Sequence, residues 1–403
     1  MNELLLKNAR IALGPVIEPG SILIRDGRIV EVAVHGAHPA GMVSRDTVDL
    51  NGAYLTPGMI DIHIHGSTGI DVLEADRDGL AKLSSFLLRE GVTGFFATLV
   101  PTSDASYISA LSQIRSFIEL QRSHNEARTG LKGARILGVH FEGPFVSRNR
   151  CGALQTRHLR AFDGDQRSIE LFIRSATGSG LGVSSLITVA PEIEGGLDLV
   201  KRLADGDDRV FIGHTEADPE TLDLAAQAGA RHITHFPNAL DPLHHRKPGA
   251  VAWGLVRGDV SVDCIADLHH VHPLMLDVIY HAKGSGRMAL ISDAISPTGM
   301  GDGEFTVWGD RISVSDGKTE LVSGNVRGTI AGSVITMRQA IKNVVSLGIP
   351  VADAFRMASS VPAMAAGIEN ELGSIQQGKV ADLVAFDDGL NVQHAVVAGK
   401  MIF

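Results

Sequence analysis

Short apolar stretches with the two-residue alternation of β-strands lie at both ends of the chain. Residues 21–25 and 28–32 flank an Asp-Gly turn, and residues 381–386 and 392–397 have the same strand-like character. We therefore expect both ends of the chain to build one small β-sandwich domain. Two separate flanking hairpins are the alternative that the pattern leaves open.

The middle of the chain alternates between short apolar runs and longer segments with helical spacing. Segments such as 78–90, 103–121, 219–228 and 273–281 are typical of helices that cover a sheet, and residues 333–347 follow the last apolar run. The expected strands are residues 59–65, 94–100, 136–141, 186–189, 210–213, 232–234, 260–266 and 288–292.

Strands that alternate with helices pair in parallel, and eight of them are the number that closes a (β/α)8 barrel. An open, doubly wound sheet is the competing fold, but no glycine-rich phosphate motif follows the first strand. We therefore predict a (β/α)8 TIM barrel over residues 56–369, with the small β domain made of residues 1–55 and 370–403.

Composition restricts the classes of partner. The chain has 403 residues, 44% of them apolar, and a formal charge of −10 without any basic cluster, which argues against a nucleic-acid partner. No apolar run approaches the roughly 18 residues of a membrane span, and the first residues lack the apolar core of a signal peptide. With only Cys151 and Cys264, a disulfide framework is not expected, so we predict a cytoplasmic protein.

Side chains of metal-ligand type follow the expected strands one after another. Barrel enzymes build their active sites at these strand ends, and side chains two residues apart point to the same side of a strand, as His63 and His65 would. One such histidine is ordinarily a core or loop residue, but the ordered set indicates a metal site. Its members are His63, His65, His140, Glu142, His214, His235, Asp267, His270, His272 and Asp293.

Imidazole and carboxylate ligands together suit a divalent transition metal such as Zn²⁺ or Fe²⁺. Such an ion lowers the pKa of a bound water and so supplies hydroxide near neutral pH. A neighbouring carboxylate accepts the proton and passes it to a leaving amine, and Asp293 is our candidate for this general acid/base. The alternative for Asp293 is the N-cap of a following helix. The chemistry predicted is metal-dependent amide hydrolysis.

The segments that carry these residues resemble a known family. Residues 57–66, Pro-Gly-Met-Ile-Asp-Ile-His-Ile-His-Gly, resemble the opening motif of the amidohydrolase superfamily. Residues 140–145, His-Phe-Glu-Gly-Pro-Phe, resemble the signature of N-acetylglucosamine-6-phosphate deacetylases. The likeness runs from about residue 50 to the C-terminus and includes residues 213–215, 234–240, 245–249, 292–294 and 328–333.

The resemblance implies a ligand set. Glu142, His214 and His235 are expected to hold the principal metal, with the glutamate where many superfamily members carry a carboxylated lysine. Because His63 and His65 are both present, a second metal is allowed. We therefore expect one or two divalent ions per subunit, with Zn²⁺ as the first choice and Fe²⁺ as the alternative.

The resemblance also implies roles around the metal. Asp293 matches the general acid/base, and His270 matches the residue that contacts substrate and polarises the acetyl carbonyl. The expected reaction removes acetate from N-acetylglucosamine 6-phosphate, and we expect a homodimer with residues 244–246 at or near the interface. The expected substrate contacts are Ala153, Asn238, Ala239, Arg246, His270, Ile330, Ala331 and Gly332. Among them, the backbone groups of Asn238 and Ala239 and the Arg246 guanidinium match the phosphate-binding elements.

Three departures from the family pattern concern the sugar pocket. Leu154 stands where the family usually has histidine, Leu268 stands where it usually has glycine, and Phe236-Pro237 precedes the Asn-Ala pair. They keep open a relative that hydrolyses another N-acyl amine, such as a different N-acetyl amino sugar or an N-acyl amino acid. Outside enzymes, the alternative is a barrel that has lost catalysis and serves as a structural protein; metal analysis separates the two.

Overall fold

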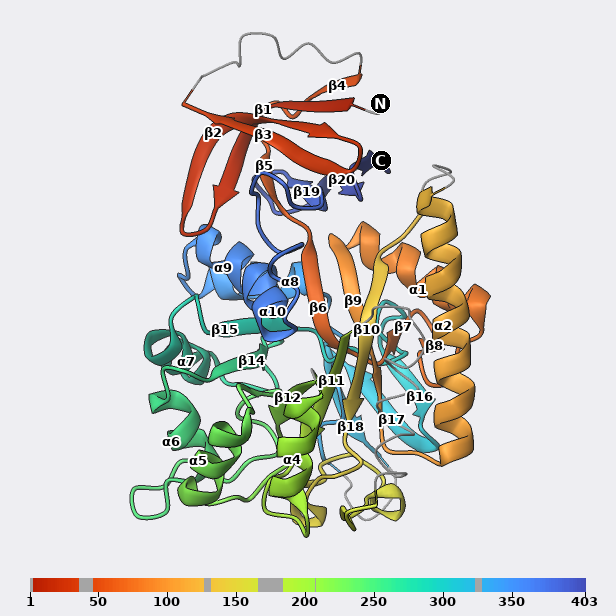
Figure 1. Cartoon of the computed structure of the whole chain (residues 1–403), viewed down its shortest axis with the longest axis vertical. Coiled ribbons are helices and arrows are strands. Elements are labelled where there is room, and N and C mark those ends of the chain that lie inside the picture. The colour runs from red at the N-terminus through yellow and green to blue at the C-terminus, as the bar shows by residue number, and fades with distance from the viewer. Residues whose placement is uncertain (1–2, 36–45, 127–131, 166–183, 207, 323–327) are drawn as a thin grey trace.

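Eight parallel strands form the centre of the molecule (Figure 1). The computed structural model describes residues 3–35, 46–126, 132–165, 184–206, 208–322 and 328–403. An isolated bridge between Ile64 of β6 and Ala294, which lies three residues after β15, brings the first and last strands together and nearly closes the ring. In sheet order the strands are β6 (Met59–Ile64), β9 (Val92–Leu99), β10 (Arg135–Glu142), β11 (Ser184–Val189), β12 (Arg209–Ile212), β13 (His232–Ile233), β14 (Ser261–Ile265) and β15 (Met288–Ile291). The predicted (β/α)8 barrel is confirmed.

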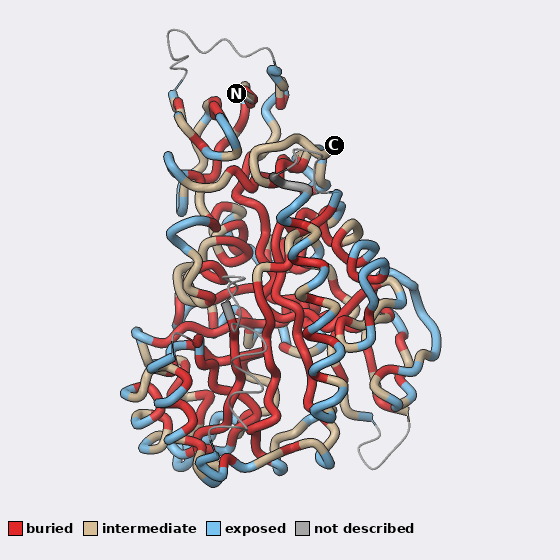
Figure 2. The backbone as a smooth tube through the Cα atoms, turned by 45° about the vertical axis from the view of Figure 1, so that its right-hand side comes forward, coloured by how far each residue is buried: buried red, intermediate tan, exposed pale blue. Residues whose placement is uncertain are grey.

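The barrel strands are covered on both faces, and most of their residues are apolar. Every residue of β6, β9, β14 and β15 is buried, which is the pattern of a parallel sheet enclosed by helices. Figure 2 shows the same contrast, with buried strands inside and helices whose outer faces are exposed.

Helices follow the strands and cover the outside of the barrel. In α8, the buried residues Met337, Ala340, Ile341 and Val344 have the spacing of one helical face, and the Thr336 side chain caps the first turn. The helices are α1 (Arg77–Arg89), α2 (Asp104–Glu126), α4 (Gly196–Asp205), α5 (Pro219–Ala228), α6 (Gly249–Val256), α7 (Pro273–Lys283), α8 (Met337–Ser346), α9 (Val351–Ala358) and α10 (Ser360–Ala365).

Both ends of the chain contribute to one small curled sheet. Its strand order is β21-β20-β19-β5-β1-β2-β3, with β4 beside β1, and it encloses its own apolar core that includes Ile11, Ile22, Leu55 and Leu383. The prediction that the two termini meet in one β domain is confirmed. The strands are β1 (Glu3–Leu13), β2 (Val16–Arg25), β3 (Arg28–Val34), β4 (Asp46–Asp49), β5 (Tyr54–Pro57), β19 (Leu383–Phe386), β20 (Val392–Val397) and β21 (Lys400–Met401).

The connection between the two sheets orients the barrel. Only Gly58 separates β5 from β6, so β6 begins beside the small sheet and its carboxyl end points away from it. All the barrel strands are parallel, and their carboxyl ends therefore form a mouth at the far end of the molecule (Figure 1). A three-stranded antiparallel sheet follows β15 and reaches this mouth; it contains β16 (Gly303–Val307), β17 (Asp310–Ser315) and β18 (Lys318–Leu321).

Two short pairing elements and two short helical turns complete the described structure. Strands β7 (Gly66–Ser67) and β8 (Ile70–Asp71) pair directly after β6. The 3₁₀ turns η1 (Arg148–Arg150) and η2 (Thr156–His158) lie in the segment after β10. Among the described residues, no helix is both long enough and apolar enough to span a membrane.

Candidate active site

Six ionisable side chains from the strand ends meet in the barrel mouth. They form two groups of three, and within each group one nitrogen or oxygen atom per residue lies within 4.8 Å of the others. All six residues are buried. The first group is Glu142, His214 and His235, and the second group is His63, His65 and Asp293.

Glu142 lies at the centre of the first group. Its Oε1 is 3.0 Å from His214 Nε2 and 3.1 Å from His235 Nε2. The same carboxylate also faces the second group, because His65 Nε2 is 3.4 Å from its Oε2. Glu142 is thus placed between the two groups and could serve both.

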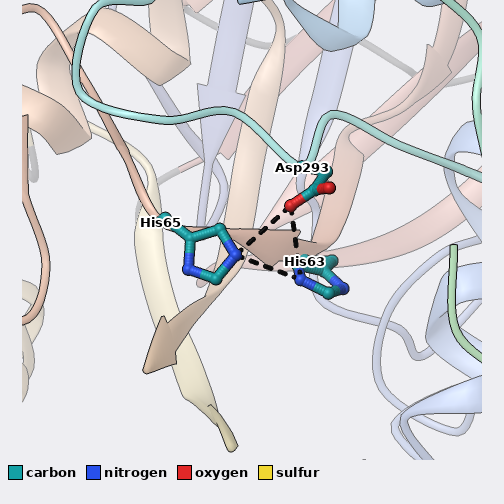
Figure 3. A group of neighbouring side chains, drawn as sticks. All are labelled: His63, His65 and Asp293. Carbon is teal, nitrogen blue, oxygen red and sulfur yellow. Dashed lines mark hydrogen bonds and ion pairs between the residues drawn. The ribbon is translucent and has the colours of Figure 1, made fainter. Parts of the chain in front are cut away.

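The second group has the same convergent arrangement (Figure 3). Asp293 Oδ1 lies 3.2 Å from His65 Nε2 and 3.4 Å from His63 Nε2, and the two histidine nitrogens are 3.2 Å apart. His63 and His65 project from the same side of β6 and its end, as their two-residue spacing predicts.

The backbone at three strand ends adopts an uncommon conformation. His214, His235 and Asp293 have φ angles of +49°, +33° and +48°, in the left-handed region that residues other than glycine rarely occupy. Each of these residues lies two positions after the end of its strand. The left-handed backbone turns the chain at this point, and the side chain enters the mouth of the barrel. Strain of this kind is concentrated at functional sites.

Neighbouring polar groups hold several of these side chains in place. His214 Nδ1 is hydrogen bonded to the carbonyl of Arg150 at 2.8 Å, and His63 Nδ1 to Thr234 Oγ1 at 3.1 Å. The Asp263 carboxylate accepts the backbone N–H of His235. The two ring contacts fix the orientation of His214 and His63 and present their Nε2 atoms to the centre of the site, while Asp263 holds the backbone of His235.

Asp61 performs a similar task between the first and last strands. Its carboxylate accepts the Ser292 hydroxyl at 2.5 Å and the backbone N–H groups of His63 and Ser292 at 3.3 Å each. Burial raises the pKa of Asp61 to about 6, against the lowering effect of these hydrogen bonds. Asp61 therefore ties together the backbone that presents His63 and Asp293.

The ring nitrogens themselves test whether a cation fits this site. His214 Nε2 and His235 Nε2 are 2.9 Å apart, and His63 Nε2 and His65 Nε2 are 3.2 Å apart. Two unprotonated nitrogens at these distances would place their lone pairs against each other. A divalent cation within each group would accept one lone pair from each of its three residues, and such nitrogen and oxygen ligands suit a transition metal. The residues therefore fit a divalent metal ion.

The pKa values describe the same charge pattern. Burial alone would raise the pKa of Glu142, but the charge of His63 and the hydrogen bonds from His214 and His235 hold it well below its ordinary value. Burial lowers the pKa of His235, but the bonded Glu142 carboxylate outweighs burial and raises it to about 9. The site thus keeps its carboxylates ionised and attracts positive charge, which a metal would supply.

His270 stands at the edge of the site and has its own orienting carboxylate. Its Nδ1 lies 2.6 Å from Asp267 Oδ2, while Asp267 Oδ1 accepts the backbone N–H groups of His269 and His270 at 2.9 and 2.8 Å. Nδ1 is therefore occupied, and Nε2 is the ring nitrogen left to meet a ligand. His272 has a different task, because its ring caps the first turn of α7.

A cavity of about 260 Å³ opens over the two groups. The predicted site residues that line it include His65, Glu142, His214, His235, His270 and Asp293. Of the predicted substrate contacts outside the metal groups, Ala153, Asn238, Ala239, Ile330 and Gly332 also line it.

Two predicted substrate contacts do not line this cavity. Ala331 is 1% exposed and packs in a small apolar cluster with Ile295 and Val307. Arg246 is exposed on the loop after β13, where its Nη1 lies 2.8 Å from His245 Nε2. Within one chain, the cavity is therefore built without the Arg246 guanidinium.

The two leucines that depart from the family pattern, Leu154 and Leu268, lie in different surroundings. Leu154 lines the cavity, as its position in the sequence suggests. Leu268 instead has a φ of +68° and packs against the main apolar core, so its side chain is not part of the cavity wall. The expectation that Leu268 crowds the sugar pocket is wrong, because the left-handed backbone directs the side chain elsewhere.

Other sequence expectations are also resolved by geometry. His140, which precedes Glu142, is hydrogen bonded to the Ile62 carbonyl and to Thr188 Oγ1, at 2.9 and 2.8 Å, and belongs to neither group. Residues 294–302 are described and contain no helix, so the alternative that Asp293 caps a helix is wrong.

Trp308 is a cavity residue that the sequence did not single out. It lines the cavity, and its ring lies 5.0 Å from that of His65. Asp61 is a second residue that the sequence did not single out: it belongs to the segment of residues 57–66, but no role was predicted for it. The two-residue alternation that linked His63 to His65 extends to Asp61 and could have identified it; nothing comparable marks Trp308.

The chain is similar to known proteins along nearly its whole length. The model of the family described as "Amidohydrolase family" matches residues 54–402. An N-acetylglucosamine-6-phosphate deacetylase of Vibrio furnissii is 36% identical over 364 residues, 90% of this chain and 86% of that protein. The deacetylase of the same name from Bacillus subtilis is 35% identical over 403 residues, 100% of this chain and 97% of the relative.

Among solved structures, a mutant Mycobacterium smegmatis N-acetyl-D-glucosamine-6-phosphate deacetylase, crystallised with N-acetyl-D-glucosamine 6-phosphate, is similar along the whole chain. It superimposes with a TM-score of 0.85 at 31% identity and 100% coverage of both chains. The likeness therefore extends over the barrel and the small sheet alike.

Proposed function

The chain belongs to the amidohydrolase family, and we propose on this premise that it removes the acetyl group from N-acetylglucosamine 6-phosphate. Water is the second substrate, and the products are glucosamine 6-phosphate and acetate. The observation that carries the proposal is the pair of buried ligand groups around Glu142, in a chain that matches the named deacetylases along 90% or more of its length.

Glu142, His214 and His235 would hold the principal divalent ion, with Zn²⁺ expected and Fe²⁺ the alternative. His63 and His65, together with Asp293, offer a place for a second ion. When bound, the metal supplies a water of lowered pKa and polarises the acetyl carbonyl. Its identity and number are part of the proposal.

Asp293 moves the proton in the proposed reaction. Burial would raise the pKa of Asp293, but the charges of His63 and His65 lower it, so the carboxylate is ionised and able to accept a proton from the attacking water. The water oxygen forms a bond to the acetyl carbon, and the C–N bond then breaks. Asp293 returns the proton to the departing amine nitrogen, which balances the reaction.

The remaining residues bind and orient the substrate. His270, held by Asp267 at 2.6 Å, would direct Nε2 to the acetyl carbonyl oxygen. Asn238 and Ala239 would meet the phosphate, and Ala153, Ile330 and Gly332 would lie against the sugar. Ala331 contributes by holding this last loop against its apolar cluster.

We also propose a homodimer in which the loop of residues 241–248 lies at the interface. Leu243 in this loop is 54% exposed, and Leu274 on α7 is 67% exposed, so both could be covered in an assembly. A partner subunit would cover them and would bring Arg246 to a phosphate. Light scattering should show twice the mass of one chain; a monomer at working concentration would contradict the dimer.

Two further parts of the proposal concern the domain boundaries of the chain and its location in the cell. We propose residues 1–55 and 370–403 as the small β domain and 56–369 as the catalytic domain. We place the protein in the cytoplasm, in keeping with the two unpaired cysteines Cys151 and Cys264.

Acetate release from a panel of sugars tests the reaction. The panel contains N-acetylglucosamine, N-acetylgalactosamine and their 6-phosphates, with an N-acetyl amino acid as the control from another class. We expect the highest kcat/KM for N-acetylglucosamine 6-phosphate. If another compound of the panel has the highest kcat/KM, the proposed substrate is wrong but deacetylation stands. If no compound releases acetate, the proposed function is overturned.

A further inference from the structure

The turn between β16 and β17 contains a residue that the turn itself does not favour. Trp308 and Gly309 are its two central residues, with φ angles of +52° and +86°, and Val307 pairs with Asp310 across it. Turns with two positive φ angles favour asparagine, aspartate or glycine. A bulky residue in the left-handed region is an outlier, and such outliers persist where they serve a function.

The Trp308 indole is held by contacts on several sides. Its ring meets the edge of the His65 ring at a centroid distance of 5.0 Å and an interplanar angle of 78°. Its Nε1–H donates to Asp71 Oδ2 at 2.9 Å, and its backbone carbonyl accepts a hydrogen bond from Gln155 Nε2. The ring is therefore fixed beside a candidate metal ligand.

Trp308 also joins two small apolar clusters that border the cavity. One cluster contains Leu154 and Val146, and the other contains Ile295 and Ala331. Trp308 and Leu154 both line the cavity of about 260 Å³. Together they make an apolar wall at the side of the cavity where His65 lies.

The position of this wall indicates which part of a substrate it meets, and this step rests on the proposed function. Asn238 and Ala239 follow β13, whereas His65 follows β6, and β14 and β15 lie between these strands in the closed ring. The phosphate end and the Trp308 wall are thus on different sides of the mouth. In an N-acetylhexosamine 6-phosphate, the acylamino carbon C2 is opposite C5, which carries the phosphorylated arm. A sugar with its phosphate at β13 therefore directs its acyl group toward His65 and Trp308.

We propose that Trp308 is the residue that determines which acyl groups the enzyme removes, by limiting the length of the chain beyond the carbonyl carbon. The apolar wall accepts the methyl group of an acetamide. The fixed indole occupies the space that a propionyl or butyryl chain would need. Trp308 acts through its bulk and takes no part in proton transfer or metal binding.

Hydrolysis of N-acetyl-, N-propionyl- and N-butyrylglucosamine 6-phosphate tests this role. The variants Trp308→Gly and Trp308→Asn remove the ring and suit a left-handed turn, so the hairpin should fold. We expect the ratio of butyryl to acetyl kcat/KM to rise by about tenfold or more in both variants, the usual effect of one or two methylene groups in an apolar pocket.

Trp253 provides the matched control. It lies in α6, where its indole donates to Asp223 Oδ1 at 2.9 Å, and it does not line the cavity. Trp253→Phe should leave the acyl ratio unchanged, and Trp308→Phe should raise it by less than Trp308→Gly does.

The outcomes separate this inference from the proposed function. If the Trp308 variants retain metal and all three substrates lose kcat/KM by one common factor, or by none, Trp308 is merely structural and the inference is overturned. If the wild-type chain releases no acyl group from any of the three sugars, the proposed function fails, and the inference fails with it.

Discussion

Two kinds of buried histidine share the interior of this barrel, and their ring nitrogens have different partners. In the first kind both nitrogens meet oxygen atoms. His232 is bonded to Ser261 Oγ at 2.7 Å and to Asp263 Oδ2 at 2.8 Å, and His140 is bonded to the Ile62 carbonyl and Thr188. These rings are fully satisfied by the fold itself.

In the second kind the outward nitrogens point at one another. The Nε2 atoms of His214 and His235 are 2.9 Å apart, and those of His63 and His65 are 3.2 Å apart, with Glu142 between the pairs. Burial of such groups is costly unless a further positive charge joins them. The comparison teaches that a buried histidine is recognised as a candidate ligand when its Nε2 meets other ring nitrogens around a shared carboxylate.

The largest effect should come from removing the shared carboxylate. In Glu142→Ala the imidazoles lose the carboxylate that faces both groups, and water does not replace its charge. We expect metal content to fall below one tenth of the wild-type value, and kcat/KM to fall by about 10³-fold or more, because the Lewis-acid contribution is several kcal/mol. Metal analysis and acetate release measure the two effects. A variant with full metal and near-normal turnover would remove the site described here.

Asp293→Asn should have the next largest effect and should separate chemistry from metal binding. The amide keeps the shape of the carboxylate but neither accepts nor returns the proton, so kcat should fall by about 10² to 10⁴. The principal metal should stay, because Glu142, His214 and His235 are untouched. Turnover like that of the wild type would exclude the proposed general acid/base.

His232→Gln tests a histidine of the first kind, whose two ring nitrogens both meet oxygen atoms. The longer, flexible amide keeps one of the two hydrogen bonds that the imidazole makes, so the free energy of unfolding should fall by about 1 kcal/mol. Metal content should be that of the wild type, since His232 is not a ligand. Urea unfolding and metal analysis of the same preparation measure both; a loss of metal without loss of stability would reverse the assignment.

A smaller effect is expected from Lys283, a buried cation whose partners are also oxygens. Its ammonium donates to the carbonyls of Gly254 and Arg257 at 2.8 and 2.6 Å, and burial, aided by Arg287, lowers its pKa to about 8. Between pH 8 and the unfolded value of 10.5, the unfolded chain binds this proton and the folded chain does not. Stability therefore rises with pH in this window and is level below it.

Lys283→Met should lack this rise. Unfolding of both proteins in urea at pH 7.5, 8.5 and 9.5 would show it as a difference in free energy that grows with pH. Parallel curves for the two proteins would mean that the pKa of Lys283 is not lowered.

The fold could be predicted from the sequence because the barrel strands are buried on both faces and therefore consist mostly of apolar residues. Even β13, with only His232 and Ile233 in the strand, was among the predicted strands as the short run of residues 232–234. The six convergent side chains were also named in advance, because strand ends of a parallel barrel share one mouth.

The partners of those side chains could not be predicted in the same way. His140 and His232 resemble the ligand histidines in spacing, and only contacts with other strands, such as that of His232 with Asp263, distinguish them. Leu268 was expected in the sugar pocket, but its direction depends on a left-handed backbone. Trp308 gave no signal, since it meets His65 across more than 240 positions of sequence.

The central claim is that the converging nitrogens hold a divalent metal on which hydrolysis depends. Elemental analysis of the wild-type chain, before and after treatment with a chelator, tests it when acetate release is measured on the same samples. The account predicts about one to two divalent ions per chain, loss of activity together with the metal, and recovery when Zn²⁺ or Fe²⁺ is returned. Full activity in a chain stripped of its metal would contradict it.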